Sequence, residues 1–448
     1  MPAYSALFDR LGIRLPDVLL PRPGTDLAKW AVVACDQYSS EREYWKRAAD
    51  TVGQAPSTLN LIFPEAFLED EDKAERVGRI QAAMRDYLAQ GVLEAKGEGF
   101  VLVERFTPYE QKPRVGLMIA VDLEQYHYGK ESRSLIRPTE GTIVERLPPR
   151  MQIRRGAPLE LPHIMLLVDD PKRSLIEPLY ERRATMPKLY DFELMLGSGR
   201  IRGWQVKDAA LLDRFALALD HLADPAAFKS AYGTEDVLLF AVGDGNHSLA
   251  TAKAIWEETK KEHSRDPQIA DHPARWALVE LVNIYDEGLP FHPIHRVLFG
   301  VDEEKFLGGL SGYLEHHIER TRDKDRAFAL ADEIETGGAH RVAFHSSLGS
   351  GVISFPHPRA KLAAGSIQEY LDSFLKANPK VGIDFIHGRE SLEALAMKPG
   401  NLGLYLPPID KSSFFGTVIR DGVMPRKTFS MGEAPEKRFY VEARRITR

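Results

Sequence analysis

The stretch Val237-Leu-Leu-Phe-Ala-Val242-Gly-Asp-Gly-Asn-His247 joins an apolar run to a polar, glycine-containing turn. A continuous apolar run of this length is typical of a strand that is buried on both faces. Beyond the turn, Leu249, Ala252, Ile255 and Trp256 recur at helical spacing and predict a helix over 247–263. The stretch therefore predicts a strand that runs through a tight turn directly into a helix.

Strands and helices alternate on both sides of this stretch. Apolar runs and period-two patterns predict strands, and 3.6-residue spacing predicts helices. The expected strands are 30–35, 99–106, 114–123, 163–169, 276–284, 341–344, 351–355, 403–406 and 439–443, with a hairpin over 191–206. The expected helices are 71–90, 209–222, 303–316 and 327–335, with another that ends near Trp45. We expect an α/β or α+β fold with a mixed sheet and flanking helices.

The length and a change of composition predict three regions. A chain of 448 residues exceeds one ordinary domain. Prolines and charges gather from Arg137 to Arg155, and the composition changes again near Gly300. We therefore expect an N-terminal α/β region over 1–135, a central region with the glycine turn over 136–300, and a C-terminal α/β region over 301–448.

Composition narrows the class of protein. The sequence is 44% hydrophobic and 28% charged, with a formal charge of −6, so a globular core is expected and an extended nucleic-acid surface is not. A single cysteine, Cys35, cannot close an internal disulfide, and it is expected to be an inert core residue. We see neither a secretory signal nor a membrane span, and expect a cytoplasmic location.

The turn at residues 243–248 has the residues of an anion site. Gly243 and Gly245 let the backbone approach a ligand closely, and the first N–H groups of the following helix favour negative charge. Asp244 is itself an anion, so a phosphate beside it needs a cation between them, and magnesium is the natural choice. His247 adds a group that titrates near neutral pH. The alternative is a plain structural turn in which Asp244 or Asn246 caps the helix.

Three further segments carry candidate groups for an anionic ligand. Arg137-Pro-Thr-Glu140-Gly-Thr142 with Arg146 suits a phosphate or carboxylate clamp, and a surface ion-pair loop is the alternative. His295 and Arg296 suit a phosphate site better than a zinc site, because no third ligand stands nearby. Lys427 and Thr428 near the C-terminus suit an anionic ligand or a surface turn equally well.

Five segments in order resemble a known bacterial family. They are Val33-Ala-Cys-Asp-Gln-Tyr38, the 137–146 segment, Asp244-Gly-Asn-His247, Pro293-Ile-His-Arg296 and Met424-Pro-Arg-Lys-Thr428. Together they look like the family of domain of unknown function one-thousand-and-fifteen, over about 32–445. The resemblance implies a ParB/sulfiredoxin-like core similar to that of free-serine kinases, with Asp244, Gly245 and His247 at the nucleotide phosphates. The family's segment is Asp-Gly-His-His-Arg; its first histidine is Asn246 here and its arginine is Ser248, and the loss of that arginine removes one positive charge.

The residues and the resemblance together predict a nucleotide-dependent phosphotransferase. It would use ATP or ADP with Mg²⁺ held by Asp244, and its acceptor would be a small hydroxylated metabolite such as a serine-like amino acid. Gly243, Gly245, Asn246, Ser248, Arg137, Thr142, Arg146, His295, Arg296 and Lys427 would contact nucleotide or phosphate. Asp244 would be catalytic, and Glu140 or His247 would take the acceptor's proton. The alternatives are a ParB-like nucleotide-binding switch without turnover and a phosphoester or nucleotide hydrolase.

Overall fold

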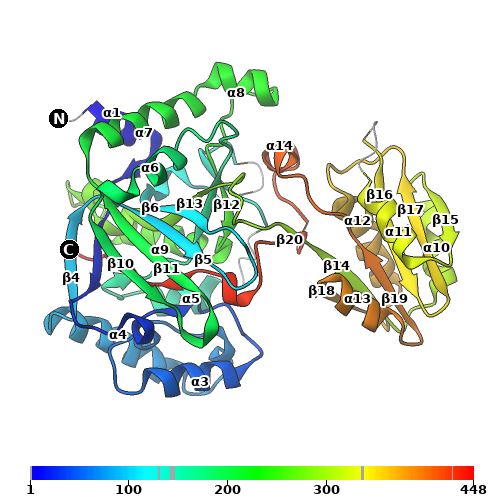
Figure 1. Ribbon diagram of the computed structural model, residues 1–448, viewed down its shortest axis with the longest axis horizontal. Coiled ribbons are helices and arrows are strands. Elements are labelled where there is room, and N and C mark those ends of the chain that lie inside the picture. The colour runs from blue at the N-terminus through cyan, green and yellow to red at the C-terminus, as the bar shows by residue number, and fades with distance from the viewer. Residues whose placement is uncertain (1–2, 130–131, 142–146, 334–337, 426) are drawn as a thin grey trace. The chain divides into compact units, whose positions relative to one another are not determined.

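The computed structural model describes residues 3–129, 132–141, 147–333, 338–425 and 427–448 (Figure 1). The chain divides into two compact units. The first unit comprises residues 1–289 together with 432–448, and the second comprises residues 290–431. Each unit has its own sheet and its own apolar core.

A nine-stranded mixed sheet organises the described part of the first unit. Its two longest strands, β6 (Arg114–Asp122) and β13 (Trp276–Asn283), are buried along their whole length, as expected for strands covered on both faces. The two pair antiparallel, whereas β13 pairs parallel with β9 (Met165–Val168). In spatial order the sheet runs β10 (Lys188–Glu193), β11 (Arg200–Val206), β5 (Phe100–Phe106), β6, β13, β9, β12 (Phe240–Asp244) and β7 (Ile136–Pro138), and β1 (Ile13–Arg14) pairs with β6.

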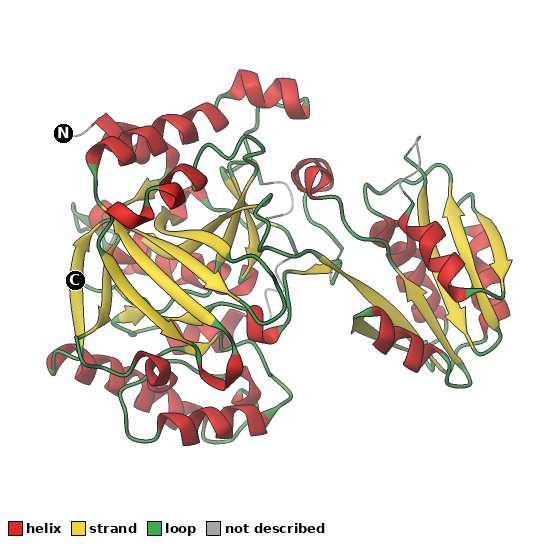
Figure 2. Ribbon diagram, viewed as in Figure 1, coloured by secondary structure: helices red, strands yellow, loops and turns green. Residues whose placement is uncertain are grey.

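Helices surround this sheet (Figure 2), and three separate two-stranded ribbons pair segments near the chain ends with other segments of the unit. The helices are α1 (Ala3–Leu11), α2 (Leu27–Trp30), α3 (Arg42–Val52), α4 (Lys73–Ala89), α5 (Leu147–Arg154), α6 (Glu177–Glu181), α7 (Ala209–Leu222), α8 (Pro225–Tyr232) and α9 (Asn246–Glu262). The ribbons pair β2 (Asp17–Pro21) with β4 (Leu93–Glu98), β3 (Val32–Val33) with β21 (Phe439–Tyr440), and β8 (Leu159–Glu160) with β22 (Arg444–Arg445). The last two ribbons place the C-terminal segment within the first unit.

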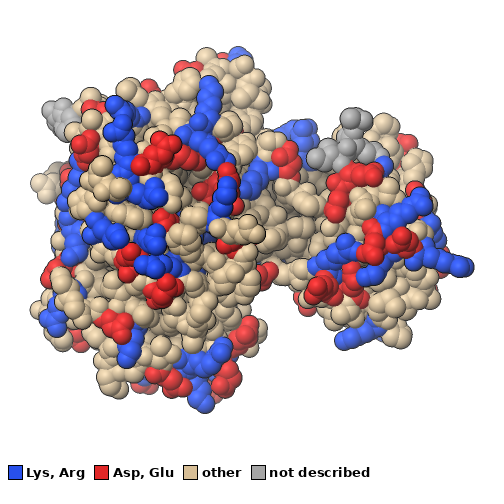
Figure 3. Space-filling model, viewed as in Figure 1, with Lys and Arg blue, Asp and Glu red and all other residues tan. Residues whose placement is uncertain are grey.

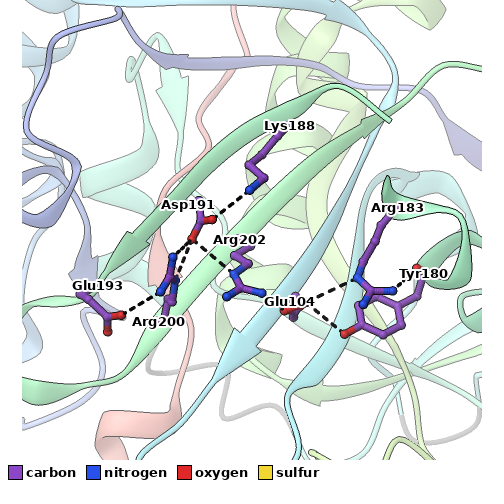
Figure 4. A network of polar contacts seen from close by, with 8 residues as sticks. All are labelled: Glu104, Tyr180, Arg183, Lys188, Asp191, Glu193, Arg200 and Arg202. Atoms are coloured by element: carbon purple, nitrogen blue, oxygen red, sulfur yellow. Dashed lines mark hydrogen bonds and ion pairs between the residues drawn. The ribbon is translucent and has the colours of Figure 1, made fainter. Parts of the chain in front are cut away.

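A polar network fixes the β10–β11 hairpin to its neighbours (Figure 4). The buried carboxylate of Glu104 on β5 accepts hydrogen bonds from Tyr180 Oη at 3.0 Å and from Arg202 at 3.2 Å. Arg202 Nε also lies 3.3 Å from Asp191 on β10, so one guanidinium links two strands. Such a charge-assisted network holds the hairpin in register against the sheet.

The second unit is built on a seven-stranded antiparallel sheet among its described residues. Neighbouring residues such as Val297 and Leu298 belong to different cores, because successive side chains of a strand point to opposite faces. The strands are β15 (His317–Thr321), β17 (Gly349–Phe355), β16 (His340–Ser346), β19 (Asn401–Tyr405), β14 (His292–Phe299), β18 (Gly382–His387) and β20 (Phe429–Ser430). The helices are α10 (Glu303–Gly309), α11 (Lys324–Asp332), α12 (Ala363–Ala377), α13 (Arg389–Ala396) and α14 (Lys411–Asp421).

The mixed α/β architecture that the sequence predicts is confirmed, but one helix is shorter than expected. The helix expected over 303–316 stops at Gly309, and His316-His317 leads into strand β15 instead of lying on a helix. The reason is glycine: Gly308, Gly309 and Gly312 weaken the helix. Gly309 also lies where a Cβ atom would stand 2.3 Å from the hydroxyl of Tyr370.

The two units divide the chain differently from the three expected regions. Strands from 1–135 and from 136–300 pair within one sheet, so no unit boundary falls at residue 135. The observed break lies at 289/290, and residues 432–448 return to the first unit through β21 and β22. Pairing between distant strands is a tertiary effect that composition does not report.

The surface and the helices carry two further observations. On the face shown in Figure 3, lysines and arginines are interspersed with aspartates and glutamates on both units. None of the helices in the described ranges combines the length and the apolar character needed to cross a bilayer. The expectation that nucleic acid is not a partner stays a prediction.

Candidate functional site

The turn between β12 and α9 requires glycine at position 245. β12 ends at Asp244, α9 begins at Asn246, and Gly245 between them has φ +76°. An added Cβ would lie 3.0 Å from Ile164 Cα and 3.1 Å from Ile164 Cγ1. Side chains other than glycine are disfavoured both by this conformation and by this contact. The turn is therefore held tightly against the segment that leads into β9.

The strand end and the helix start both present polar groups at this turn. The pairing of β12 with β9 shifts register between Val242 and Asp244, and such a bulge redirects the side chains next to it. The hydrogen-bond ladder of α9 begins with Leu249, whose N–H donates to the Gly245 carbonyl at 3.0 Å. The N–H groups of the first turn precede that ladder, and they carry the positive end of the helix dipole.

Asp244 is paired with a lysine from the C-terminal segment. Lys437 Nζ lies 3.2 Å from Asp244 Oδ2, and the Gly245 N–H donates to Asp244 Oδ1 at 2.9 Å. Burial alone would raise the pKa of Asp244, but the charge of Lys437, the nearby His163 and these hydrogen bonds lower it overall. Asp244 is thus held as a carboxylate beside a cation that the sequence analysis did not single out.

Asn246 ties the turn to the neighbouring strand. Its Oδ1 accepts the Thr139 N–H at 3.2 Å, and its Nδ2 donates to the Val242 carbonyl at 3.4 Å. The Thr139 hydroxyl donates to the same carbonyl at 2.6 Å. Both side chains are buried. These bonds hold Thr139 against the turn, and Glu140 is the next residue in the chain.

Ser248 begins a chain of polar side chains that sequence reasoning missed. Its Oγ lies 2.7 Å from His163 Nε2, and His163 Nδ1 lies 2.8 Å from the Tyr440 hydroxyl. The Tyr440 hydroxyl in turn accepts the Cys35 N–H at 3.1 Å. Asp36 Oδ2 is 4.0 Å from His163 Nε2. These residues come from four distant segments, and no short motif connects them.

Cys35 is half-buried, and its lack of reactivity stays a prediction. Burial, with the nearby charge of Asp36, raises the pKa of Cys35 to about 12. The thiolate is the reactive form, so the raised pKa disfavours reaction of this thiol near neutral pH.

The 137–146 segment contributes a second residue with a structural task besides Thr139. Arg137 is buried and donates to three backbone carbonyls, those of Ser134 at 2.9 Å, Asp236 at 2.8 Å and Val237 at 3.2 Å. It therefore joins β7 to the approach of β12, and its contact with phosphate stays a prediction. Thr142 and Arg146 lie outside the described residues.

His295, Arg296 and Lys427 belong to the second unit. Arg296 is fully buried and donates to Gln368 Oε1 at 3.3 Å and to the Ile294 carbonyl. Burial lowers the pKa of Arg296 to about 10. His295 Nδ1 accepts the Leu406 N–H at 3.1 Å, and burial lowers the pKa of His295 to about 4. Lys427 is exposed.

The turn offers magnesium a single carboxylate, so water and substrate phosphates would have to supply the other ligands. Among the described residues, no group of three or more His, Cys, Asp or Glu side chains could enclose a metal ion. Magnesium is commonly held by one or two carboxylates, with water and substrate phosphates completing the shell. Asp244 fits that role, and its carboxylate would then contact both the ion and Lys437.

His247 is half-buried in the first turn of α9, and its carbonyl accepts the Thr251 hydroxyl at 2.7 Å.

Comparison with known proteins identifies a family. Three solved structures are similar over about three quarters of this chain. A conserved hypothetical protein from Pyrococcus furiosus has 12% identity and TM-score 0.36, covering 74% of this chain and 95% of that one. A variant free serine kinase in complex with ADP has 10% identity and TM-score 0.38, with 74% and 92% covered. The C-terminally truncated SbnI from Staphylococcus aureus has 9% identity and TM-score 0.33, with 72% and 82% covered.

These TM-scores are too low to carry an argument about fold or function. No curated protein matches the chain. The family model described as "Protein of unknown function (DUF1015)" matches residues 19–372, more than three quarters of the chain. The chain therefore belongs to the DUF1015 family.

Proposed function

We propose that this protein is a nucleotide-dependent phosphotransferase that acts on a small hydroxylated metabolite. The observation that carries the proposal is the turn itself. Gly245 is in the left-handed conformation at the start of the 17-residue helix α9, and the lysine–carboxylate pair Lys437–Asp244 lies beside it. A helix start with a tight glycine turn and an adjacent lysine is a recurring way to hold phosphate groups.

Each group would have a distinct task in the reaction. The N–H groups of the first turn and Lys437 would hold the phosphates of ATP or ADP, and Asp244 would hold Mg²⁺ against their oxygens. The acceptor's hydroxyl oxygen would form a bond to the terminal phosphoryl group, while the bond from that phosphorus to the nucleotide breaks. The acceptor's proton would pass to Glu140 or His247. Stabilising the charge on the transferred group is the main catalytic requirement of such reactions.

The other predicted contacts remain part of the proposal. Gly243, Asn246, Ser248, Arg137, Thr142 and Arg146 are the further candidates for nucleotide or phosphate contact at the turn, and the anion contacts predicted for His295, Arg296 and Lys427 stay separate predictions about the second unit. The order of the five sequence segments supports a ParB/sulfiredoxin-like core. The lone cysteine supports a reducing, cytoplasmic setting.

Thermal unfolding with ATP, ADP and CTP, each with and without Mg²⁺, tests the proposal. A nucleotide at 100 times its dissociation constant stabilises the folded state by about 2.7 kcal/mol. We expect a magnesium-dependent rise in Tm that Asp244→Ala and Lys437→Ala abolish. Asp224→Ala is the control, because Asp224 likewise accepts a backbone N–H before a helix, that of Ala227 at 2.7 Å, but lies at the start of α8. If no nucleotide raises the Tm, the turn is a structural cap and the proposal fails.

Turnover requires its own assay. With ATP or ADP as the donor and a panel of small alcohols, hydroxy acids and serine-like amino acids, we expect release of ADP from ATP, or of AMP from ADP, that depends on one class of acceptor. Release of phosphate without any acceptor would identify a hydrolase instead. Binding without either product would identify a nucleotide-binding switch.

A further inference from the structure

A second site adjoins the turn: a pocket of about 150 Å³ within the first unit. Ser248, His163, Tyr440 and Cys35 line one part of it. Ser248 belongs both to this pocket and to the first turn of α9. A ligand in the pocket would therefore have its polar end beside the proposed phosphate site.

Most of the remaining wall is apolar. It includes side chains from the segment after α3, from α4 and α5, and from the central strand β13. Among them are Leu61, Phe63, Met84, Ile153, Leu159 and Leu278. A wall of this kind recognises a hydrocarbon body, because removing apolar surface from water stabilises binding by about 0.8 kcal/mol for each methylene group.

The charged residues on the wall are already paired with one another. Arg154 Nη2 lies 2.6 Å from Glu160 Oε2, and Arg150 forms an ion pair with Glu65. Glu160 also forms an ion pair with Arg444, whose Nη2 lies 2.6 Å from Glu160 Oε1. A charged ligand would have to compete with these pairs and lose its hydration. The wall therefore favours a neutral ligand over a sugar acid or a zwitterion.

We infer that this pocket binds the acceptor of the proposed phosphotransfer, and that the acceptor is a short-chain aliphatic alcohol. Its hydroxyl hydrogen-bonds with the Ser248–His163 pair, and its hydrocarbon body fills the apolar part. A cavity of this volume holds about six heavy atoms, the size of benzene. The role as acceptor rests on the proposed function, whereas binding of the alcohol does not.

A ligand-observed NMR titration without nucleotide tests the inference. The probes are propanol, butanol, pentanol, hexanol and octanol, with glycerol and L-serine as polar counterparts. We expect the dissociation constant to fall about fourfold with each added methylene, the equivalent of ~0.8 kcal/mol. The trend should reverse beyond pentanol or hexanol, when the pocket is full. Affinity that keeps rising through octanol, or glycerol and serine binding as tightly as pentanol, would overturn the inference.

Two variants locate the site, and one serves as control. Ser248→Ala removes the hydroxyl next to His163 and is expected to weaken pentanol binding about tenfold, the loss of one hydrogen bond. Ala157→Leu adds bulk to the pocket wall and is expected to abolish binding, with tryptophan fluorescence reporting that the unit is folded. Thr259→Ala, which removes a hydroxyl elsewhere on α9, is expected to change nothing. Unchanged pentanol binding in both pocket variants would place the alcohol elsewhere.

The two proposals can fail separately. Alcohol binding without any nucleotide binding would retain the pocket and refute the phosphotransferase. Nucleotide binding with no chain-length optimum among the alcohols would retain the nucleotide site and refute the alcohol as ligand.

Discussion

Replacing Gly245 with alanine tests whether the turn at the proposed phosphate site is as tightly constrained as its geometry indicates. The added methyl group meets two obstacles. The left-handed conformation costs an L-residue about 1–2 kcal/mol. The new Cβ would also lie 3.0 Å from Ile164 Cα, which is backbone and cannot rotate away. The Ile164 carbonyl accepts the Glu280 N–H at 3.0 Å, so the backbone there is fixed to the central strand.

The expected loss of stability follows from the sum of these effects. Overpacking a well-filled site costs about 1–3 kcal/mol in general. For Gly245→Ala we expect a loss of about 2–5 kcal/mol in the free energy of unfolding. Gly233→Ala is the matched control, because Gly233 has φ +78° at the end of α8 but no atom lies within 4 Å of its added Cβ. It should lose only the backbone cost, about 1–2 kcal/mol.

Urea denaturation followed by tryptophan fluorescence makes the measurement specific. All five tryptophans, Trp30, Trp45, Trp204, Trp256 and Trp276, lie in the first unit, so the signal reports that unit alone. The midpoint should shift at an unchanged slope if the native state loses stability without losing compactness. A loss for Gly245→Ala that does not exceed the loss for Gly233→Ala would refute the argument that Ile164 constrains the turn.

Three further predictions concern ionisable groups. Burial raises the pKa of Asp286 to about 6, so the first unit loses stability as pH rises from about 4 to 6. Urea titrations at pH 4 and pH 7 should show that Asp286→Asn removes up to about 3 kcal/mol of this pH dependence. Burial lowers the pKa of His295 to about 4, so the second unit should lose up to about 3 kcal/mol of stability as pH falls from 6.5 to 4. In His295→Gln, the protection of β14 and β19 amides from hydrogen exchange should depend less on pH. An unchanged pH profile of that protection would contradict this. A double-mutant cycle with Asp244→Asn and Lys437→Met should give a coupling of about 1 kcal/mol in unfolding free energy, because the pair is only partly exposed. A coupling near zero would mean that Lys437 does not neutralise Asp244.

Local patterns predicted much of the fold because they carry their own physical cause. The hairpin over 191–206 forms as β10 and β11, and the helix expected over 209–222 is α7 with those bounds. In each case, side chains close in the sequence decide the structure. The helix expected over 303–316 failed for a different reason. Gly309 accommodates the hydroxyl of Tyr370, which is 61 residues away, and a window of a dozen residues cannot report such a contact.

The same limit applies to the candidate site. The sequence supplies Asp244, Gly245 and the helix start, since these are consecutive. It does not supply Lys437, which lies 193 positions from Asp244, nor His163 and Tyr440, which are 277 positions apart. Lys437, His163 and Tyr440 lie near the turn because the folded chain brings distant segments together, including the C-terminal segment that pairs through β21. Functional groups brought together in this way leave no periodicity or short motif in the sequence.

The C-terminal segment therefore has a larger part in the site than its length suggests. Between Lys437 and Tyr440 it supplies the cation beside Asp244 and the hydroxyl beside His163. Arg438, between them, donates to Glu280 on β13 at 2.9 Å in the buried interior, and its pKa is raised because the carboxylates of Glu442 and Glu280 outweigh the effect of burial. A buried ion pair of this kind is costly to break from either side. The pair thus fixes the segment to the central strand, and this attachment determines where Lys437 and Tyr440 stand relative to the turn.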